Sequence, residues 1–169
     1  MTDTDFSFDN NLYICKVTAD KKKCPTYLRS IPAVAQLFDR GIEFKKRITV
    51  FMGENGIGKS TLLEAIAAAY GFNPEGGTRN FSFSTYNSHS ELYGALKLSR
   101  GGYPKDGFFL RAESFYNVAS EIERLDNIPA ASPPIIDGYG GVSLHEQSHG
   151  ESFMALAMNR FRGHGLYIL

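Results

Sequence analysis

The chain has 169 residues, of which 43% are hydrophobic and 21% charged, as is usual for one globular domain. Eighteen Lys and Arg balance 18 Asp and Glu, so the overall charge indicates neither a nucleic-acid nor an anionic-membrane partner, although it leaves a local basic patch open. The two cysteines, Cys15 and Cys24, are too few for a disulfide framework and favour the cytosol. The acidic N-terminus is unlike a signal peptide, and no run reaches the roughly 20 apolar residues of a membrane span. We therefore expect a cytoplasmic protein without a membrane anchor.

The predicted elements of the first half lead into a glycine-rich loop. We expect residues 1–11 to be flexible and residues 12–17 to form a strand. Ser30 is predicted to cap a short helix, with Gly41 as its stop signal. Residues 48–52, which are apolar and β-branched, predict a strand that enters the glycines. A helix is then predicted over residues 60–70, with Gly71 as its stop.

The second half continues the alternation of strands and helices. Its predicted elements are a strand at 81–83, a short helix at 90–99, a strand at 108–110, a helix at 115–125, an irregular segment at 128–141, a helix at 152–161 and a strand at 166–169. This order predicts a single α/β domain over residues 1–169, with a mostly parallel central sheet.

Residues 53–60 match the pattern G-x-x-x-x-G-K-[ST] of a phosphate-binding loop. The candidate binding residues are Gly53, Glu54, Asn55, Gly56, Ile57, Gly58, Lys59, Ser60 and Thr61. Glycines let successive N–H groups point at one anion, and the following helix adds the positive end of its dipole. Lys59 is expected to hold the β- and γ-phosphates, and the Ser60 hydroxyl to bind Mg²⁺. A chance glycine turn is the alternative, but the predicted strand before and helix after the loop argue against it. The sequence therefore predicts ATP binding.

A second polar helix start lies at Ser148-His149-Gly150-Glu151. It fits a capping box, with Ser148 as N-cap and Glu151 three residues later. A capping box alone does not explain Gly150 or the polar run at 145–147. A second phosphate site at this helix start is the competing interpretation.

With these motifs the sequence resembles ATPases of the ABC type, and more narrowly a group of small bacterial AAA/ABC-type ATPases without a membrane domain. The segments that carry the resemblance are GENGIGKSTLLEAIA, GGTRNFSFS, GFFLRAESF and SLHEQSHGESF. Residues 147–151 resemble a variant of the L-S-G-G-Q signature. The resemblance implies a P-loop NTPase fold that begins with an antiparallel β element.

The resemblance also implies a head-to-tail homodimer that encloses ATP between the P-loop of one copy and the signature helix of the other. Ser148, Gly150 and in some measure His149 would then contact the γ-phosphate. Glu113 is a candidate for the family's Q-loop position, although it is Glu instead of Gln and also fits an ordinary acidic residue at a helix start. Arg79 is a weaker phosphate candidate in a glycine-rich loop, where a solvated arginine is the better explanation.

The sequence departs from the family after residues 166–169. The family's Walker B strand continues into Asp-Glu, a D-loop and a switch histidine, whereas this sequence ends at Leu169. His145, His149 and His164 all precede that strand. We therefore expect a fragment or truncated form, incomplete at its C-terminus, that binds nucleotide and whose turnover alone is doubtful.

Three functions remain open at this point. The first is an ABC-type ATPase domain that dimerises on ATP, and the second is a non-hydrolysing, nucleotide-dependent interaction module. The third is a P-loop phosphotransferase, which the lack of a compact arginine-rich lid and the signature-like motif both disfavour. A nucleic-acid partner is compatible with the sequence but is not indicated by it.

Overall fold

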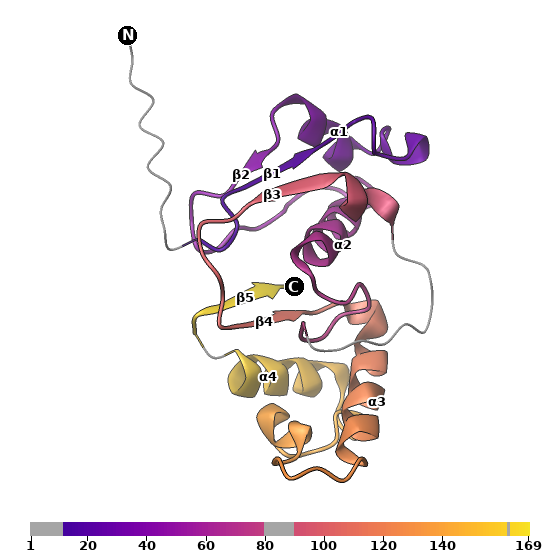
Figure 1. Ribbon diagram of the computed structural model, residues 1–169. Helices are drawn as coiled ribbons and strands as arrows, with labels where there is room; N and C mark the ends of the chain where they lie inside the picture. Colours follow the sequence, from indigo (N-terminus) through magenta and orange to yellow (C-terminus); the bar gives the residue numbers. More distant parts are fainter. Residues whose placement is uncertain (1–11, 80–89, 162) are drawn as a thin grey trace. The chain divides into compact units, whose positions relative to one another are not determined.

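The computed structural model describes residues 12–79, 90–161 and 163–169, which divide between two compact units (Figure 1). Unit 1 comprises Met1–Gly71 and Ser90–Pro104, and unit 2 comprises Phe72–His89 and Lys105–Leu169. The flexible segment predicted at 1–11 and the strand predicted at 81–83 lie outside the described residues.

Unit 1 contains a three-stranded antiparallel sheet of order β2-β1-β3. Its strands are β1 (Lys16–Ala19), β2 (Ile42–Glu43) and β3 (Leu96–Ser99). Val17 is fully buried on one face, while Lys16 on the other face forms an ion pair of 3.1 Å with Glu43. This sheet confirms the expected antiparallel N-terminal element, although its first strand begins at Lys16 and not at residue 12.

Two α-helices pack with this sheet, α1 (Pro32–Asp39) and α2 (Lys59–Tyr70) (Figure 1). The 3₁₀ helices η1 (Thr26–Leu28) and η2 (Glu91–Ala95) complete the unit. Ser30 does not cap α1 as predicted; Pro32 occupies the first helical position, where its missing N–H costs nothing, and Ile31 is the N-cap. Gly71 ends α2 as predicted, in a left-handed conformation from which its N–H bonds Ala67 and Ala68.

Two predictions in unit 1 are wrong. Residues 48–52 form no strand, and among the described residues no neighbouring strand pairs with them. Their side chains Ile48, Val50 and Met52 are exposed, so β-propensity alone has not produced a strand where no backbone partner is present. Residues 90–99, predicted as a helix, instead divide into η2 and β3, because β3 pairs with β1 over four residues in register.

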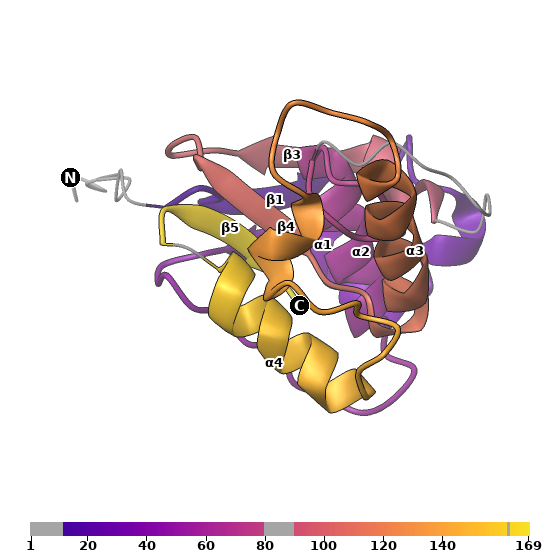
Figure 2. The same cartoon turned by 90° about the horizontal axis from the view of Figure 1, so that it is seen from below.

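Unit 2 contains a parallel strand pair flanked by helices (Figures 1 and 2). Its elements are β4 (Asp106–Phe109), η3 (Ala112–Ser114), α3 (Phe115–Asp126), η4 (Ile135–Tyr139), α4 (His149–Arg160) and β5 (Gly165–Ile168). The strands pair with Phe108 opposite Tyr167. Within the described residues this pair is the parallel part of the fold, so the expected mostly parallel sheet is corrected to mixed sheets in an α/β chain.

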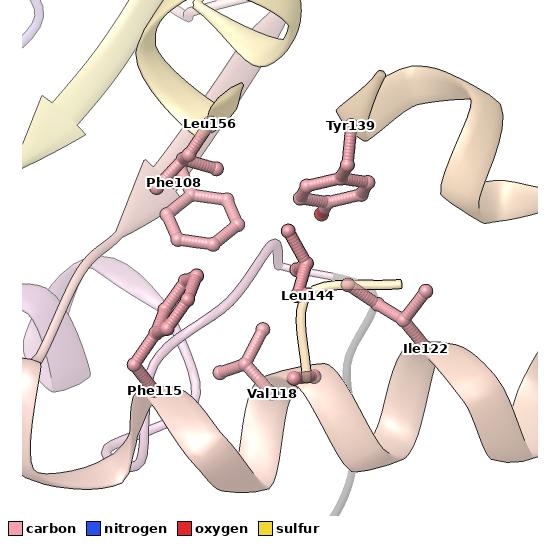
Figure 3. Close-up of a cluster of buried hydrophobic side chains, with 8 residues drawn as sticks. Phe108, Phe115, Val118, Ile122, Tyr139, Leu144 and Leu156 are labelled. Atoms are coloured by element: carbon pink, nitrogen blue, oxygen red, sulfur yellow. The ribbon is translucent and has the colours of Figure 1, made fainter. Parts of the chain in front are cut away.

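The core of unit 2 gathers side chains from β4, α3, η4 and α4 (Figure 3). Its buried members are Phe108, Phe115, Val118, Ala119, Ile122, Tyr139, Leu144 and Leu156. The four α3 residues recur at the spacing of one helix face, as the sequence predicted. Phe108 and Tyr139 meet edge to face at 6.3 Å, an arrangement that aromatic rings prefer.

Cys15 and Cys24 are both buried and carry free thiols, as two reduced cysteines should. In the part of the chain that the structure describes, no helix has both the length and the apolar character that a membrane crossing demands.

Candidate functional site

The predicted phosphate loop connects residue 52 to the N-terminus of α2 in unit 1. Gly53, Gly56 and Gly58 adopt positive φ angles of 151°, 85° and 96°, a region that residues with a Cβ rarely occupy. A Cβ added to Gly53 would also lie 2.3 Å from Cδ1 of Ile57. The glycines of the motif are therefore required by the backbone path of the loop.

The backbone N–H groups of residues 55–61 are available to a ligand. Among the described residues, none of these groups donates to a protein acceptor. Those of residues 59–61 are also the unpaired donors of the first turn of α2, where the helix dipole is positive. The loop thus presents a row of donors and a partial positive charge, which is the arrangement that binds a phosphate.

Lys59 adds a full positive charge to this loop. Its Nζ donates to the carbonyl oxygens of Gly53 at 2.8 Å and Glu54 at 2.7 Å, so the ammonium group lies over the loop's own backbone. Ser60, one residue later, is exposed in the first turn of α2. The ammonium can bind phosphate oxygens, and the exposed hydroxyl can ligate a divalent cation.

The position of α2, and with it the loop, is fixed by side chains that are buried around most of the helix. Leu62, Ala65 and Ile66 are buried, and Ala65 belongs to a cluster with Cys24, Leu28, Val34, Leu92 and Ala95. The motif analysis missed Glu64, a buried carboxylate that accepts the Ser90 N–H at 3.0 Å and so ties α2 to the start of η2. Glu64 lies on the side of the helix opposite to Leu62 and Ile66, so the predicted apolar face gave no signal of its burial.

The second motif forms the N-terminus of α4 in unit 2, and its capping box is confirmed. The Ser148 hydroxyl accepts the Glu151 N–H at 3.4 Å, and the Glu151 carboxylate accepts the Ser148 N–H at 2.9 Å. The Ser148 side chain and then its backbone N–H lower the pKa of Glu151 from its ordinary value. Gly150 is exposed, and a Cβ there would meet nothing within 4 Å.

The polar run before α4 anchors its own loop. His145 Nε2 lies 3.2 Å from Ser120 Oγ, and its ring meets Tyr116 edge-on at 4.4 Å. Gln147 Nε2 donates to the Val142 carbonyl at 3.1 Å. His145 and Gln147 therefore have structural partners that explain them without a ligand.

The remaining candidates lie on other elements. Glu113 belongs to η3, directly after β4, and its exposed carboxylate faces Arg111 at 3.6 Å. Arg79 is exposed in the loop that follows Phe72. The roles implied for Glu113 and Arg79 stay predictions. Residues 53–61 are together in unit 1, whereas Ser148, Gly150 and Glu113 are in unit 2, the first two at one helix start.

Across residues 12–79, 90–161 and 163–169, no group of three or more His, Cys, Asp or Glu is placed to hold a metal ion.

Comparison with known proteins agrees with the geometry of the loop. Residues 29–123, which include α1, the loop and α2, match a family described as AAA domain. A segment of 65 residues is 40% identical to the DNA double-strand break repair Rad50 ATPase of Aeropyrum pernix; it covers 38% of this chain and 7% of that protein's length. No solved structure gives a significant match. Because the family match spans more than half of the chain, the protein belongs to the AAA-domain family of P-loop ATPases.

Proposed function

We propose that this chain binds Mg·ATP through residues 53–61. The observation that carries the proposal is the row of N–H groups at 55–61 without protein acceptors, beside the Lys59 ammonium. The N–H groups would cradle the phosphates, and Lys59 would exchange its two carbonyl partners for phosphate oxygens. Mg²⁺ would neutralise phosphate charge, with Ser60 as its ligand from the protein. The AAA-domain match supports this assignment.

Calorimetric titration with Mg·ATP tests the proposal in three proteins. Wild type should bind, and Lys59→Ala should weaken affinity by at least about tenfold, which corresponds to about 1.4 kcal/mol. Lys22→Ala is the matched control, because it removes the same charge from an exposed turn residue away from the loop. It should leave affinity within about twofold of wild type. A folded wild-type chain that binds no ATP would contradict the proposal.

We further propose that ATP joins two copies head to tail, with Ser148 and Gly150 of one copy directed at the ATP held by the other. The start of α4 is exposed and its dipole favours an anion. Charge is also unevenly divided along the chain. Unit 1 holds twelve Lys and Arg against nine Asp and Glu, whereas unit 2 holds six against nine. A head-to-tail pair would bring a basic unit to an acidic one.

Light scattering of Gly150→Asp in the presence of Mg·ATP tests this association. An aspartate in the first turn of α4 suits the helix dipole and meets no neighbour, so the fold should be kept. Its charge would repel a phosphate, so the variant should bind ATP and remain monomeric. Gly163→Asp, also free of neighbours within 4 Å, is the control and should dimerise as wild type does. Equal dimerisation of both variants would refute the role of α4.

A further inference from the structure

The first turn of α1 contacts the phosphate loop within unit 1. The Ala33 N–H donates to the Ile57 carbonyl at 3.0 Å. A Cβ placed on Gly58 would lie 2.3 Å from Cγ2 of Ile31 and 3.5 Å from Cβ of Ala33. The start of α1 therefore touches the loop through a hydrogen bond at residue 57 and through a side chain at residue 58.

The hydrogen bond determines the direction of one N–H group of the loop. In a trans peptide the C=O and N–H bonds point in opposite directions, and the Ile57–Gly58 peptide is trans. Since the Ile57 carbonyl points at α1, the Gly58 N–H points away from α1, and among the described residues it has no protein acceptor. A reversed peptide would instead present a carbonyl dipole to an incoming anion and repel it.

The side-chain contact keeps this peptide from reversing. Gly58 holds φ at 96°, and Ile31 Cγ2 occupies the space on that side of its Cα. Ile31 is itself held: its carbonyl accepts the N–H groups of Val34 and Ala35, both at 2.9 Å. The next residue, Pro32, has a fixed φ, and Val34 and Leu37 anchor α1 in the core. The contact of Ile31 with Gly58, called the brace below, therefore starts from a rigid helix N-terminus.

We infer that Ile31 and the Ala33 N–H are positioning groups, which hold the Ile57–Gly58 peptide in the orientation that receives a polyphosphate. The inference rests on the proposed nucleotide binding at residues 53–61. In the free chain the loop is accordingly already arranged for its ligand, and the ordering cost on binding is reduced. Neither group needs to touch the nucleotide.

Two substitutions of Ile31 separate this role from general stability. Ile31→Leu keeps the side-chain volume but removes Cγ2, whereas Ile31→Val keeps both γ carbons, Cγ2 among them, and loses only Cδ1. Binding of Mg·ATP and of inorganic tripolyphosphate is measured by calorimetry, with thermal unfolding of the free chain alongside. Ile31→Leu should lower the affinity for both ligands by about tenfold. Ile31→Val should keep both affinities within about threefold of wild type.

Leu37→Ala serves as the control for general destabilisation. Leu37 is buried on the same helix, and it is not among the nearest neighbours of the loop glycines Gly53, Gly56 and Gly58. This variant should therefore unfold at the lowest temperature of the series and keep affinity within about twofold. Ile31→Leu binding as tightly as wild type, or Leu37→Ala losing as much affinity as Ile31→Leu, would overturn the inference. Failure of the folded wild type to bind either ligand would instead refute the proposed function.

Discussion

Gly58 and Gly71 flank α2 and differ in the space that is free around each of them for an added side chain. Both have left-handed backbones, with φ of 96° and 106°. A Cβ on Gly58 would meet Ile31 at 2.3 Å, whereas one on Gly71 would meet nothing within 4 Å. The two positions therefore separate the cost of backbone conformation from the cost of enclosure.

We predict that alanine is costlier at Gly58 than at Gly71. Gly71→Ala should lower the free energy of unfolding by about 1 kcal/mol, the cost of a left-handed residue with a Cβ. Gly58→Ala adds overpacking against a stiff β-branched side chain and should cost at least about 2 kcal/mol. Urea denaturation measures both, and calorimetry should show loss of ATP binding only for Gly58→Ala. Equal losses in the free energy of unfolding for the two variants would show that Ile31 does not fill the space beside Gly58.

We predict that the free energy of unfolding depends on pH through Glu151. Its pKa is lowered in the folded chain by the Ser148 side chain and the Ser148 N–H, so the ionised carboxylate favours folding. This contribution is complete above the ordinary glutamate pKa of about 4.3 and disappears as the pH falls through the folded pKa. Glu151→Gln should therefore be less stable than wild type at pH 7, and the difference should shrink below about pH 4.

Denaturant unfolding at several pH values measures this difference. Glu146→Gln is the matched control, because Glu146 is an exposed residue of the loop before α4 and its backbone N–H, not its side chain, donates to the Ser143 carbonyl. It should follow wild type at every pH. A Glu151→Gln difference that is constant with pH would show that the capping box does not depend on the charge of the carboxylate.

At the scale of elements, the C-terminal end of α4 is tied to the parallel strands by a polar cluster. Arg160 donates two hydrogen bonds to Asp106 of β4, at 2.8 and 2.9 Å, and Tyr167 of β5 donates to the same carboxylate at 3.2 Å. Both members of the ion pair are largely buried, each with 22% of its side chain exposed. The cluster therefore sets the direction in which the helix and its exposed N-terminus lie within unit 2.

We predict that this ion pair contributes more than a surface pair of the same type. In a double-mutant cycle, Asp106→Ala and Arg160→Ala should show a coupling free energy of about 2 kcal/mol, as expected for bidentate charged hydrogen bonds. Arg124 and Glu121 on α3 also form a bidentate contact, but Arg124 is 61% exposed. Their coupling should be about 0.5 kcal/mol or less. Equal couplings would contradict the anchoring role.

The elements that the sequence predicted well are those whose signals are local. α2 and α3 have apolar faces at helical spacing, and Gly71 and the Ser148–Glu151 capping box mark helix ends by their own chemistry. The loop at 53–61 was likewise predictable, since its glycines are needed for its own backbone. Even so, α4 begins at His149 and not at residue 152, because the capping box starts the helix one turn earlier.

The elements that the sequence predicted poorly depend on distant partners. β3 follows η2 because β1 offers it a hydrogen-bonding edge, which no local pattern reveals. Residues 48–52 have the composition of a strand but no partner among the described residues. The contact of Ile31 with Gly58 joins residues 27 positions apart in the sequence, so the brace was visible only in the structure.

At the scale of the whole molecule, a chain with no net charge contains a basic unit and an acidic one. The phosphate loop belongs to the basic unit, whose field would draw an anionic ligand to it. The proposed second contact, at the start of α4, belongs to the acidic unit. We therefore expect ATP binding to come first and association of copies to follow, so that raised salt weakens association.

The most direct measurement is an amide ¹H–¹⁵N NMR titration of the folded chain with Mg·ATP. If the N–H groups of residues 55–61 receive the phosphates, the largest chemical-shift changes should fall on these residues, Gly58 among them. Tripolyphosphate should reproduce most of these changes. Shift changes concentrated elsewhere, or none at saturating ATP, would contradict the account.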